Sequence, residues 1–327
     1  MKYLNLKLGC WDYDRTRPLL DGTVKPEGIM IESSVQSPGE TFNRMLNTLE
    51  FDVSEMSFTS YTMLRARGEA PFVGIPAFIS REFRHSCIYV HTASGIECPE
   101  DLRDKRIGIE RWNQSATVWA RAALSHDYDV RPNEVQWFFG HQDTAAQKIG
   151  YRNPIPFKMP ESAQYVPEGT TISAMFEAGE LDGMITARLP ILFAEGSPLI
   201  RRLFPDPRAV ERDYYRRTRI FPIMHTVVIK QDVYQENPWV AASLYQAFLE
   251  AKSMAERRLY ETDALSVMLP WLIDEIDQTR ELMGHDYWPY GVEPNLSTLE
   301  AWGLILKEQG LTDYVLKPEE MFVDTSP

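Results

Sequence analysis

The sequence predicts an α/β fold of two lobes, each a mixed, mostly parallel sheet flanked by helices. Three observations predict it. The chain has 327 residues, which suits two domains of roughly 100–200 residues better than one core. Strand and helix signals alternate along it, the order that builds parallel sheets. Hydrophobic residues make up 44% of the chain, enough to fill two packed cores.

The first ninety residues alternate strands and helices. The expected strands are 4–8, 51–56 and 71–79, and the expected helices are 40–49 and 58–67. The breaker Pro38-Gly39 precedes the first helix, and Ser57 or Thr59 can open the second. This order predicts a parallel, right-handed layer.

A second α/β unit begins near residue 99. Its expected strands are 106–109, 135–139 and 181–186, and its expected helices run from the loop 110–117 through 124 and over 171–179. Residues 150–169 hold four prolines, and we expect them to be irregular. A stretch of that length is usually functional or contacts a partner.

The chain then returns to the first lobe. A last strand is expected at 221–229, followed by a helix with Asn237 as its N-cap and Pro238 in its first turn. Two further helices are expected near 263–282 and 296–309.

Lobe one is therefore expected to comprise residues 1–84 and 226–327, and lobe two residues 85–225. The chain crosses between them near 83–89 and 220–226. Ligands of open α/β sheets bind beyond the carboxyl ends of strands, and clefts between lobes are preferred sites.

Charge and cysteine content exclude several classes of protein. The net charge of −13 argues against nucleic acid and anionic membrane as partners. The chain has three cysteines, Cys10, Cys87 and Cys98, an odd number without paired spacing. This number and spacing predict neither a disulfide framework nor a zinc knuckle, and they indicate a reducing compartment. Residues 1–9 alternate polar and apolar side chains as a strand does, and they lack the continuous apolar stretch of a signal peptide. No run approaches the ~20 apolar residues that a membrane-spanning helix needs. We therefore expect a cytoplasmic protein.

A basic cluster, Ser80-Arg81-Glu82-Phe83-Arg84-His85-Ser86, lies between two apolar strands. A buried guanidinium group needs an anionic partner, because an unpaired one costs several kcal/mol. Guanidinium groups bind carboxylates through two parallel hydrogen bonds, so Arg81 and Arg84 are candidate substrate-binding residues. A salt-bridge network between the lobes is the alternative.

Two histidines lie at the crossings of the chain, His85 at the first and His225 at the second. Each can exchange a proton near neutral pH and is a candidate general acid. We expect both to converge on one cleft with the two arginines. A core histidine bonded to a backbone carbonyl is the alternative for each.

The loop Glu110–Thr117 precedes a helix, with Ser115 or Thr117 at its start. Free backbone N–H groups and the helix dipole there can hold a carboxylate, although ordinary capping explains the same residues. Trp112 and Trp11 could stack on an aromatic ring, although core packing is the more common role.

Metal and nucleotide signals are weak. Asp12-Tyr13-Asp14 and His141-Gln142-Asp143 look like metal pairs, but neither has a partner motif, and such carboxylates more often pair with Arg15 or Arg111. The sequence has no glycine-rich nucleotide fingerprint, Walker loop or nucleophile elbow. We therefore predict no metal site.

Four stretches resemble the 4,5-dihydroxyphthalate decarboxylase family. They are Phe51-Asp52-Val53-Ser54-Glu55-Met56-Ser57, Phe78 through Ser86, Ala116-Thr117-Val118-Trp119-Ala120-Arg121 and Pro222-Ile223-Met224-His225. The resemblance covers nearly the whole chain, and Ser-Arg-x-Phe-Arg-His-Ser is its most specific part. It implies the two-lobed architecture of type II periplasmic binding proteins, used as a cytosolic enzyme.

The resemblance also implies the reaction. One carboxylate of 4,5-dihydroxyphthalate would leave as carbon dioxide, giving protocatechuate. No cofactor is needed, because the phenol supplies the electrons. The implied partner is a small-molecule aromatic carboxylate, and the family leads us to expect a homo-oligomer.

Site roles follow from the same resemblance. Arg81 and Arg84, with the helix start at Ser115–Thr117, would hold the retained carboxylate, and His85 or His225 would protonate the ring carbon. Asp14 and Glu55, each near a strand end, are candidates for the base near the phenol. Arg188 is expected to face the cleft from the second lobe.

Two other functions stay open. One is a solute-binding protein for an aromatic carboxylate, against which the missing signal peptide argues. The other is a lyase of the same fold acting on a chorismate-derived acid, which the catechol specificity of the site would distinguish.

Overall fold

The computed structural model describes residues 3–143, 155–158 and 160–326, and the chain forms two compact α/β units. Unit 1 comprises residues 1–81, 223–300 and 316–327, and unit 2 comprises 82–222 and 301–315. The two main divisions lie three residues before the lobe boundaries expected from the sequence. The expectation did not include the return of 301–315 to unit 2.

Unit 1 contains a five-stranded sheet with the strand order β2-β1-β3-β11-β4. Its strands are β1 (Leu4–Cys10), β2 (Ile29–Val35), β3 (Val53–Ser57), β4 (Phe72–Arg81) and β11 (Ile223–Lys230). β1 is parallel to β2 and β3, whereas β11 is antiparallel to both β3 and β4. The carboxyl ends of β1, β3 and β4 and the amino end of β11 therefore lie at one edge of the sheet.

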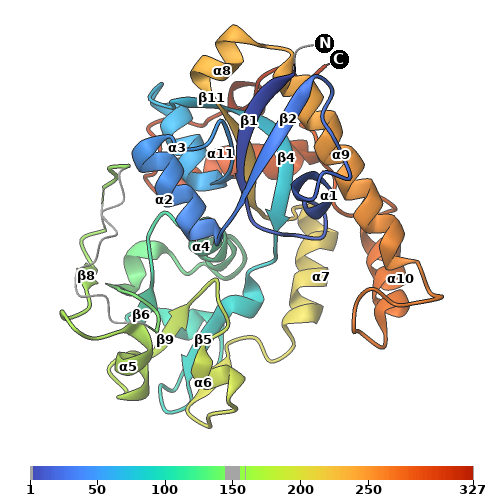
Figure 1. The fold of residues 1–327 in the computed structure, drawn as a ribbon. Coiled ribbons are helices and arrows are strands. Elements are labelled where there is room, and N and C mark those ends of the chain that lie inside the picture. Colours follow the sequence, from blue (N-terminus) through green and yellow to red (C-terminus); the bar gives the residue numbers. More distant parts are fainter. Residues whose placement is uncertain (1–2, 144–154, 159, 327) are drawn as a thin grey trace. The chain divides into compact units, whose positions relative to one another are not determined.

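Helices cover this sheet. They are α1 (Arg17–Leu20), α2 (Pro38–Thr48), α3 (Phe58–Ala66), α8 (Gln231–Glu236), α9 (Val240–Leu259), α10 (Leu272–Met283) and α12 (Pro318–Met321). α2 packs against β3 and β1, α3 against β3 and β11, and α9 against β4. Figure 1 shows α2 and α3 to the left of β1 and α9 to its right.

Local sequence explains most of these helix boundaries. The Ser57 hydroxyl accepts a hydrogen bond from the Ser60 N–H, as the predicted cap of α3 requires. α9 buries the predicted apolar stripe of Val240, Leu244, Ala247, Phe248 and Ala251. The predicted N-cap of that helix is wrong, because Asn237 ends α8 and α9 begins only at Val240.

A buried tyrosine connects the C-terminal segment to this sheet. The Tyr61 hydroxyl donates to the Met321 carbonyl and accepts from the Gly74 N–H at 2.8 Å. The Val323 N–H donates to the Gly74 carbonyl at 3.1 Å. The C-terminal segment is thus hydrogen-bonded to β4, both directly and through the Tyr61 hydroxyl.

Replacing Tyr61 by phenylalanine should lower the free energy of unfolding by about 1–3 kcal/mol, because the Gly74 N–H and the Met321 carbonyl lose their partner in a buried place. Urea denaturation measures the loss. Tyr3→Phe, at an exposed tyrosine, is the control and should change stability by less than about 0.5 kcal/mol. Equal stability of the two variants would contradict the structural role of the Tyr61 hydroxyl.

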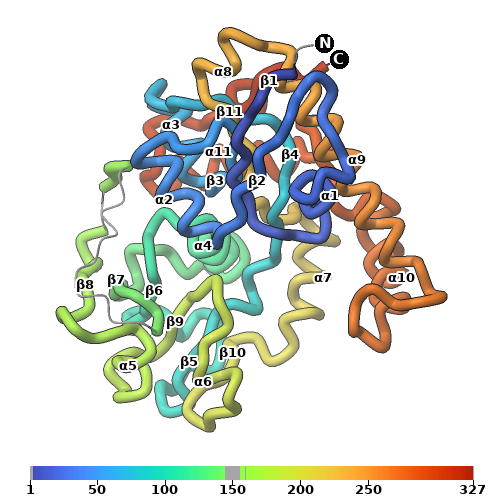
Figure 2. Tube along the Cα trace, viewed as in Figure 1, coloured from blue at the N-terminus to red at the C-terminus, as the bar shows by residue number. Residues whose placement is uncertain are grey.

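Unit 2 contains a six-stranded sheet with the order β10-β5-β9-β6-β7-β8 (Figure 2). Its strands are β5 (Ile88–His91), β6 (Arg106–Ile109), β7 (Gln136–Phe139), β8 (Ala163–Tyr165), β9 (Gly183–Ile185) and β10 (Ile200–Arg202). Its helices are α4 (Ser115–Tyr128), α5 (Ile172–Glu177), α6 (Ile191–Ala194), α7 (Pro207–Thr218) and the end of α11 (Leu296–Glu308). β6 to β9 are mutually parallel, and β5 is antiparallel to β9 and β10.

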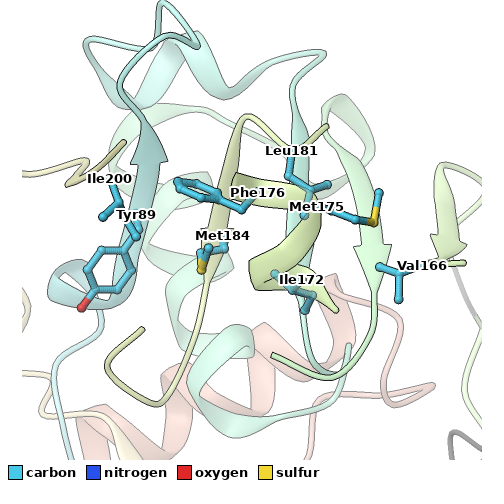
Figure 3. Packing of buried hydrophobic residues seen from close by; sticks show 8 residues of the cluster. All are labelled: Tyr89, Val166, Ile172, Met175, Phe176, Leu181, Met184 and Ile200. Carbon is cyan, nitrogen blue, oxygen red and sulfur yellow. The ribbon is translucent and has the colours of Figure 1, made fainter. Parts of the chain in front are cut away.

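A hydrophobic cluster joins α5 to this sheet. Figure 3 shows its buried members, which are Tyr89, Val166, Ile172, Met175, Phe176, Leu181, Met184 and Ile200. Gly108 of β6 permits the close approach, because a Cβ there would lie 2.6 Å from the Ile172 side chain. The glycine is thus a packing requirement of this cluster.

Most predicted elements are present, and the α/β fold class is confirmed. β2, an edge strand, was missed: four of its seven residues are apolar, but they do not alternate with polar ones. The stretch 150–169, expected to be irregular, contains β8; residues 150–154 and 159 lie outside the described residues. The helix expected over 263–282 begins only at Leu272.

The three cysteines, Cys10, Cys87 and Cys98, are free thiols. Within the described residues, no helix is long and apolar enough to cross a bilayer.

Candidate active site

A carboxylate–imidazole pair lies at the edge of the unit 1 sheet where β1 and β3 end. In the antiparallel register of β3 and β11, His225 is opposite Ser57 and Val227 is opposite Glu55. Glu55 and His225 are therefore diagonal neighbours on one face of the sheet. The His225 Nδ1 atom lies 2.7 Å from Glu55 Oε1.

Glu55 is fully buried and accepts hydrogen bonds at both oxygens. Oε2 accepts the Trp11 N–H at 2.9 Å, and Oε1 accepts the Tyr13 hydroxyl at 2.7 Å as well as His225. Burial alone would raise the pKa of Glu55, but the hydrogen bond and charge of His225, with the bonds from Tyr13 and Trp11, outweigh it. The pKa of Glu55 is lowered, so the carboxylate is ionised at neutral pH.

Tyr13 stays a hydrogen-bond donor in this arrangement. Burial, and then the charge of Glu55, raise the pKa of Tyr13 well above its usual value. Its hydroxyl also lies 3.4 Å from His225 Nδ1. Glu55, Tyr13 and His225 therefore form one hydrogen-bonded group, which we call the Glu55 triad.

His225 is the exposed member of the Glu55 triad, with 18% of its side chain accessible. The ring of Phe42 packs edge-on against it, with centroids 4.8 Å apart. The carboxylate at Nδ1 assigns a hydrogen to that nitrogen. Nε2 is then the nitrogen that can exchange a proton with a ligand.

Arg81 lies in the same unit but is bound to protein groups. It is buried at the end of β4, and its Nη1 donates to Asn295 Oδ1 at 2.7 Å and to the Pro289 carbonyl at 3.0 Å. Asp14 is exposed and pairs with Arg15 at 2.9 Å. This pairing is the alternative that the sequence left open for Asp14.

Arg84 and His85 belong to unit 2 and are both buried. Arg84 forms an ion pair with Glu82 at 3.0 Å. His85 packs against Phe204 and Tyr214, with ring centroids 5.5 and 5.1 Å away. Neither ring nitrogen of His85 has a hydrogen-bond partner among the described residues.

This environment keeps the His85 imidazole neutral. Burial, assisted by the charge of Arg217 and opposed by that of Asp127, lowers the pKa of His85 from 6.5 to about 4. A neutral, enclosed ring is poorly suited to donate a proton at pH 7. The placement of the two histidines favours His225 as the proton donor.

The other predicted binding residues lie near the carboxyl ends of β6 and β9 in unit 2. α4 begins at the buried Ser115, and the Thr117 hydroxyl lies 2.9 Å from the carbonyls of Arg111 and Gln114. Trp112 is buried, with the Arg121 guanidinium 3.6 Å from its ring centroid. The exposed Arg188 forms an ion pair with Glu110, the first residue of the loop Glu110–Thr117.

Of the predicted catalytic residues, the structure thus brings Glu55 and His225 into direct contact. Sequence reasoning missed Tyr13 and the Trp11 N–H as the groups that complete the carboxylate's hydrogen bonds. The sequence signal that could have identified Trp11 and Tyr13 was their position just after the first predicted strand. No group of three or more His, Cys, Asp or Glu side chains that could hold a metal occurs in residues 3–143, 155–158 and 160–326.

No family model matches this sequence. Two curated proteins are similar to it, and both are called 4,5-dihydroxyphthalate decarboxylase. That of Comamonas testosteroni is 37% identical over 329 residues, which cover 98% of this chain and 97% of the relative. That of Pseudomonas putida is 36% identical over 218 residues, or 66% of this chain and 83% of the relative.

Solved structures show the same fold at low identity. The periplasmic aliphatic sulphonate binding protein SsuA from Escherichia coli has a TM-score of 0.56 and 13% identity, with 98% of this chain and 97% of that chain covered. The desulfurization enzyme DSZB has a TM-score of 0.54 and 14% identity, with 98% and 96% covered. The predicted fold of a periplasmic binding protein is therefore confirmed.

Proposed function

The chain belongs to the 4,5-dihydroxyphthalate decarboxylase family, and we therefore propose that it converts 4,5-dihydroxyphthalate to protocatechuate and carbon dioxide. The observation that carries this proposal is the 37% identity over 98% of the chain with a curated decarboxylase. The Glu55 triad supports it, because the reaction needs a proton donor and His225 offers one.

The reaction replaces a bond from a ring carbon to a carboxylate by a bond from that carbon to hydrogen. Each carboxylate lies para to a hydroxyl group, so the ring carbon can accept a proton while the phenol loses one. The bond between the ring carbon and the carboxylate then breaks, and carbon dioxide leaves. The electron pair of that bond stays with the ring and restores the aromatic phenolate, which is protonated again. The net result consumes one proton.

We assign the proton delivery to His225 Nε2. Glu55 is fully buried and already accepts three hydrogen bonds, so we assign it a positioning role rather than contact with the phenol. Its carboxylate holds the imidazole in one orientation and stabilises the protonated ring. General acid catalysis of this kind contributes on the order of 10²–10⁴ in rate.

Several expectations from the sequence stay predictions. They are substrate binding by Arg81, Arg84, Ser115, Thr117, Arg188 and Trp112, catalysis by His85 and Asp14, the absence of a cofactor, the cytoplasmic location and the homo-oligomer.

Purified protein mixed with 4,5-dihydroxyphthalate tests the proposal. We expect equimolar protocatechuate and carbon dioxide, at the same rate in buffer treated with a chelator. Phthalate, which lacks the hydroxyl groups, should not be decarboxylated. Binding of the substrate without product, in both metal-stripped and metal-supplied buffer, would instead favour a solute-binding protein.

A further inference from the structure

The loop after β1 carries a positioned arginine next to the Glu55 triad. The Arg15 Cζ atom lies 4.4 Å from the ring centroid of Tyr13 and 4.3 Å from that of Trp288. We propose that Arg15 binds the retained carboxylate of the aromatic substrate. This inference rests on the proposed function and adds the residue that orients the substrate.

Arg15 is held by contacts that do not depend on an acidic partner. Its Nε donates to the Ile79 carbonyl at 2.7 Å, and the Trp288 indole N–H donates to the Phe78 carbonyl at 2.8 Å. Both the arginine and one of its stacking rings are thus fixed to β4. Only 17% of the Arg15 side chain is exposed, so little further ordering is required when a ligand binds.

The outer edge of the guanidinium group is available to an anion. Nη1 donates to Asp14, whose side chain is 58% exposed, and within the described part of the chain Nη2 has no hydrogen-bond partner. An ion pair that water screens this well is weak. A carboxylate that accepts from Nη1 and Nη2 together would form the stronger bidentate arrangement.

The phenol ring of Tyr13 links this edge to the proton donor. Arg15 stacks on the ring, and the hydroxyl at its far end is bonded to Glu55 and lies 3.4 Å from His225 Nδ1. One phenol ring therefore separates the carboxylate-binding group from the imidazole. An aromatic acid held at Arg15 would have its ring within reach of His225.

The first residue of α1, two positions further along the chain, offers a matched control. Arg17 forms an ion pair with Asp12 through Nε and Nη2, at 2.9 and 3.0 Å. Its side chain is 53% exposed, and no aromatic ring stacks on it among the described residues. Arg15 and Arg17 thus each carry a positive charge and pair with a nearby aspartate, but they differ in stacking and burial.

Steady-state kinetics with 4,5-dihydroxyphthalate, and calorimetry with phthalate as a non-reacting probe, test the inference. Arg15→Gln should raise KM and the phthalate Kd about 10- to 100-fold. Arg15→Lys keeps the charge but loses the bidentate geometry, and should weaken binding about tenfold. Arg17→Gln should stay within about twofold of wild type, and Asp14→Asn should keep the phthalate Kd within about twofold.

Unchanged phthalate affinity in Arg15→Gln or Arg15→Lys would overturn the role of Arg15 and leave the proposed reaction intact. An equal loss in Asp14→Asn would also overturn it, because Arg15 would then act through its ion pair. If Arg15→Gln does not fold, the phthalate affinity of Arg15→Lys decides alone. Wild-type protein that binds phthalate through Arg15 without turning over 4,5-dihydroxyphthalate would refute the reaction and support the binding site.

Discussion

Replacing His225 by glutamine should lower kcat for decarboxylation about 10²- to 10⁴-fold with the fold retained. Glutamine has its amide near the position of the His225 Nε2 atom, but it cannot deliver a proton to a ring carbon. Because the partial exposure of His225 leaves room for an amide, we expect little change in thermal stability. Stopped assays of protocatechuate, with saturating substrate, measure the loss.

His126→Gln is the matched control. His126 also pairs with a glutamate, Glu308, at 2.8 Å, but on an exposed surface of unit 2. It should keep the wild-type kcat. Glu55→Gln should lower kcat more than it raises KM, since Glu55 acts by positioning His225. A His225→Gln enzyme within threefold of wild type would remove His225 from the mechanism.

Acid should destabilise the protein through His85 by about 3 kcal/mol between pH 6.5 and pH 4. The pKa of His85 is about 4 in the folded chain, against the ordinary value of 6.5 that the exposed imidazole has after unfolding. Between these values the unfolded state binds a proton that the folded state does not. The stabilising contribution is therefore complete above pH 6.5 and is lost as the pH falls towards 4.

Urea denaturation at pH 7 and pH 4.5 measures this effect, and His85→Phe isolates it. Phenylalanine suits the contacts with Phe204 and Tyr214 and cannot be protonated. The variant should therefore lose about 2–3 kcal/mol less stability than wild type on acidification. The same acid loss in both proteins would show that protonation of His85 does not limit folding.

The pattern of apolar residues predicted most of the fold. β4 is buried along almost its whole length and gives a nearly continuous apolar run, whereas α9 buries one stripe of apolar residues at helical spacing. β2 and β8 were not predicted: both are edge strands, the apolar residues of β2 do not alternate with polar ones, and β8 has only three residues. The spacing of apolar residues in a segment indicates which of its own residues are buried, but not which other segment it pairs with.

The candidate site was predicted only residue by residue. Glu55 and His225 were singled out separately, but their contact depends on the register of two strands 170 residues apart, which no local pattern encodes. Local sequence also could not rank His85 against His225. What distinguishes them is the packing of His85 against Phe204 and Tyr214, which come from distant segments of the chain.

The position of β11 in the first sheet has a consequence for synthesis. β11 lies between β3 and β4, yet it begins 142 residues after the end of β4 and 166 residues after the end of β3. A nascent chain that has reached residue 222 on the ribosome therefore carries two strands whose facing edges have no neighbour to pair with. Open edges of this kind recruit other chains. Assembly of unit 1 must wait for residues 223–230, so the early strands need protection while the 149 residues after β4 are made.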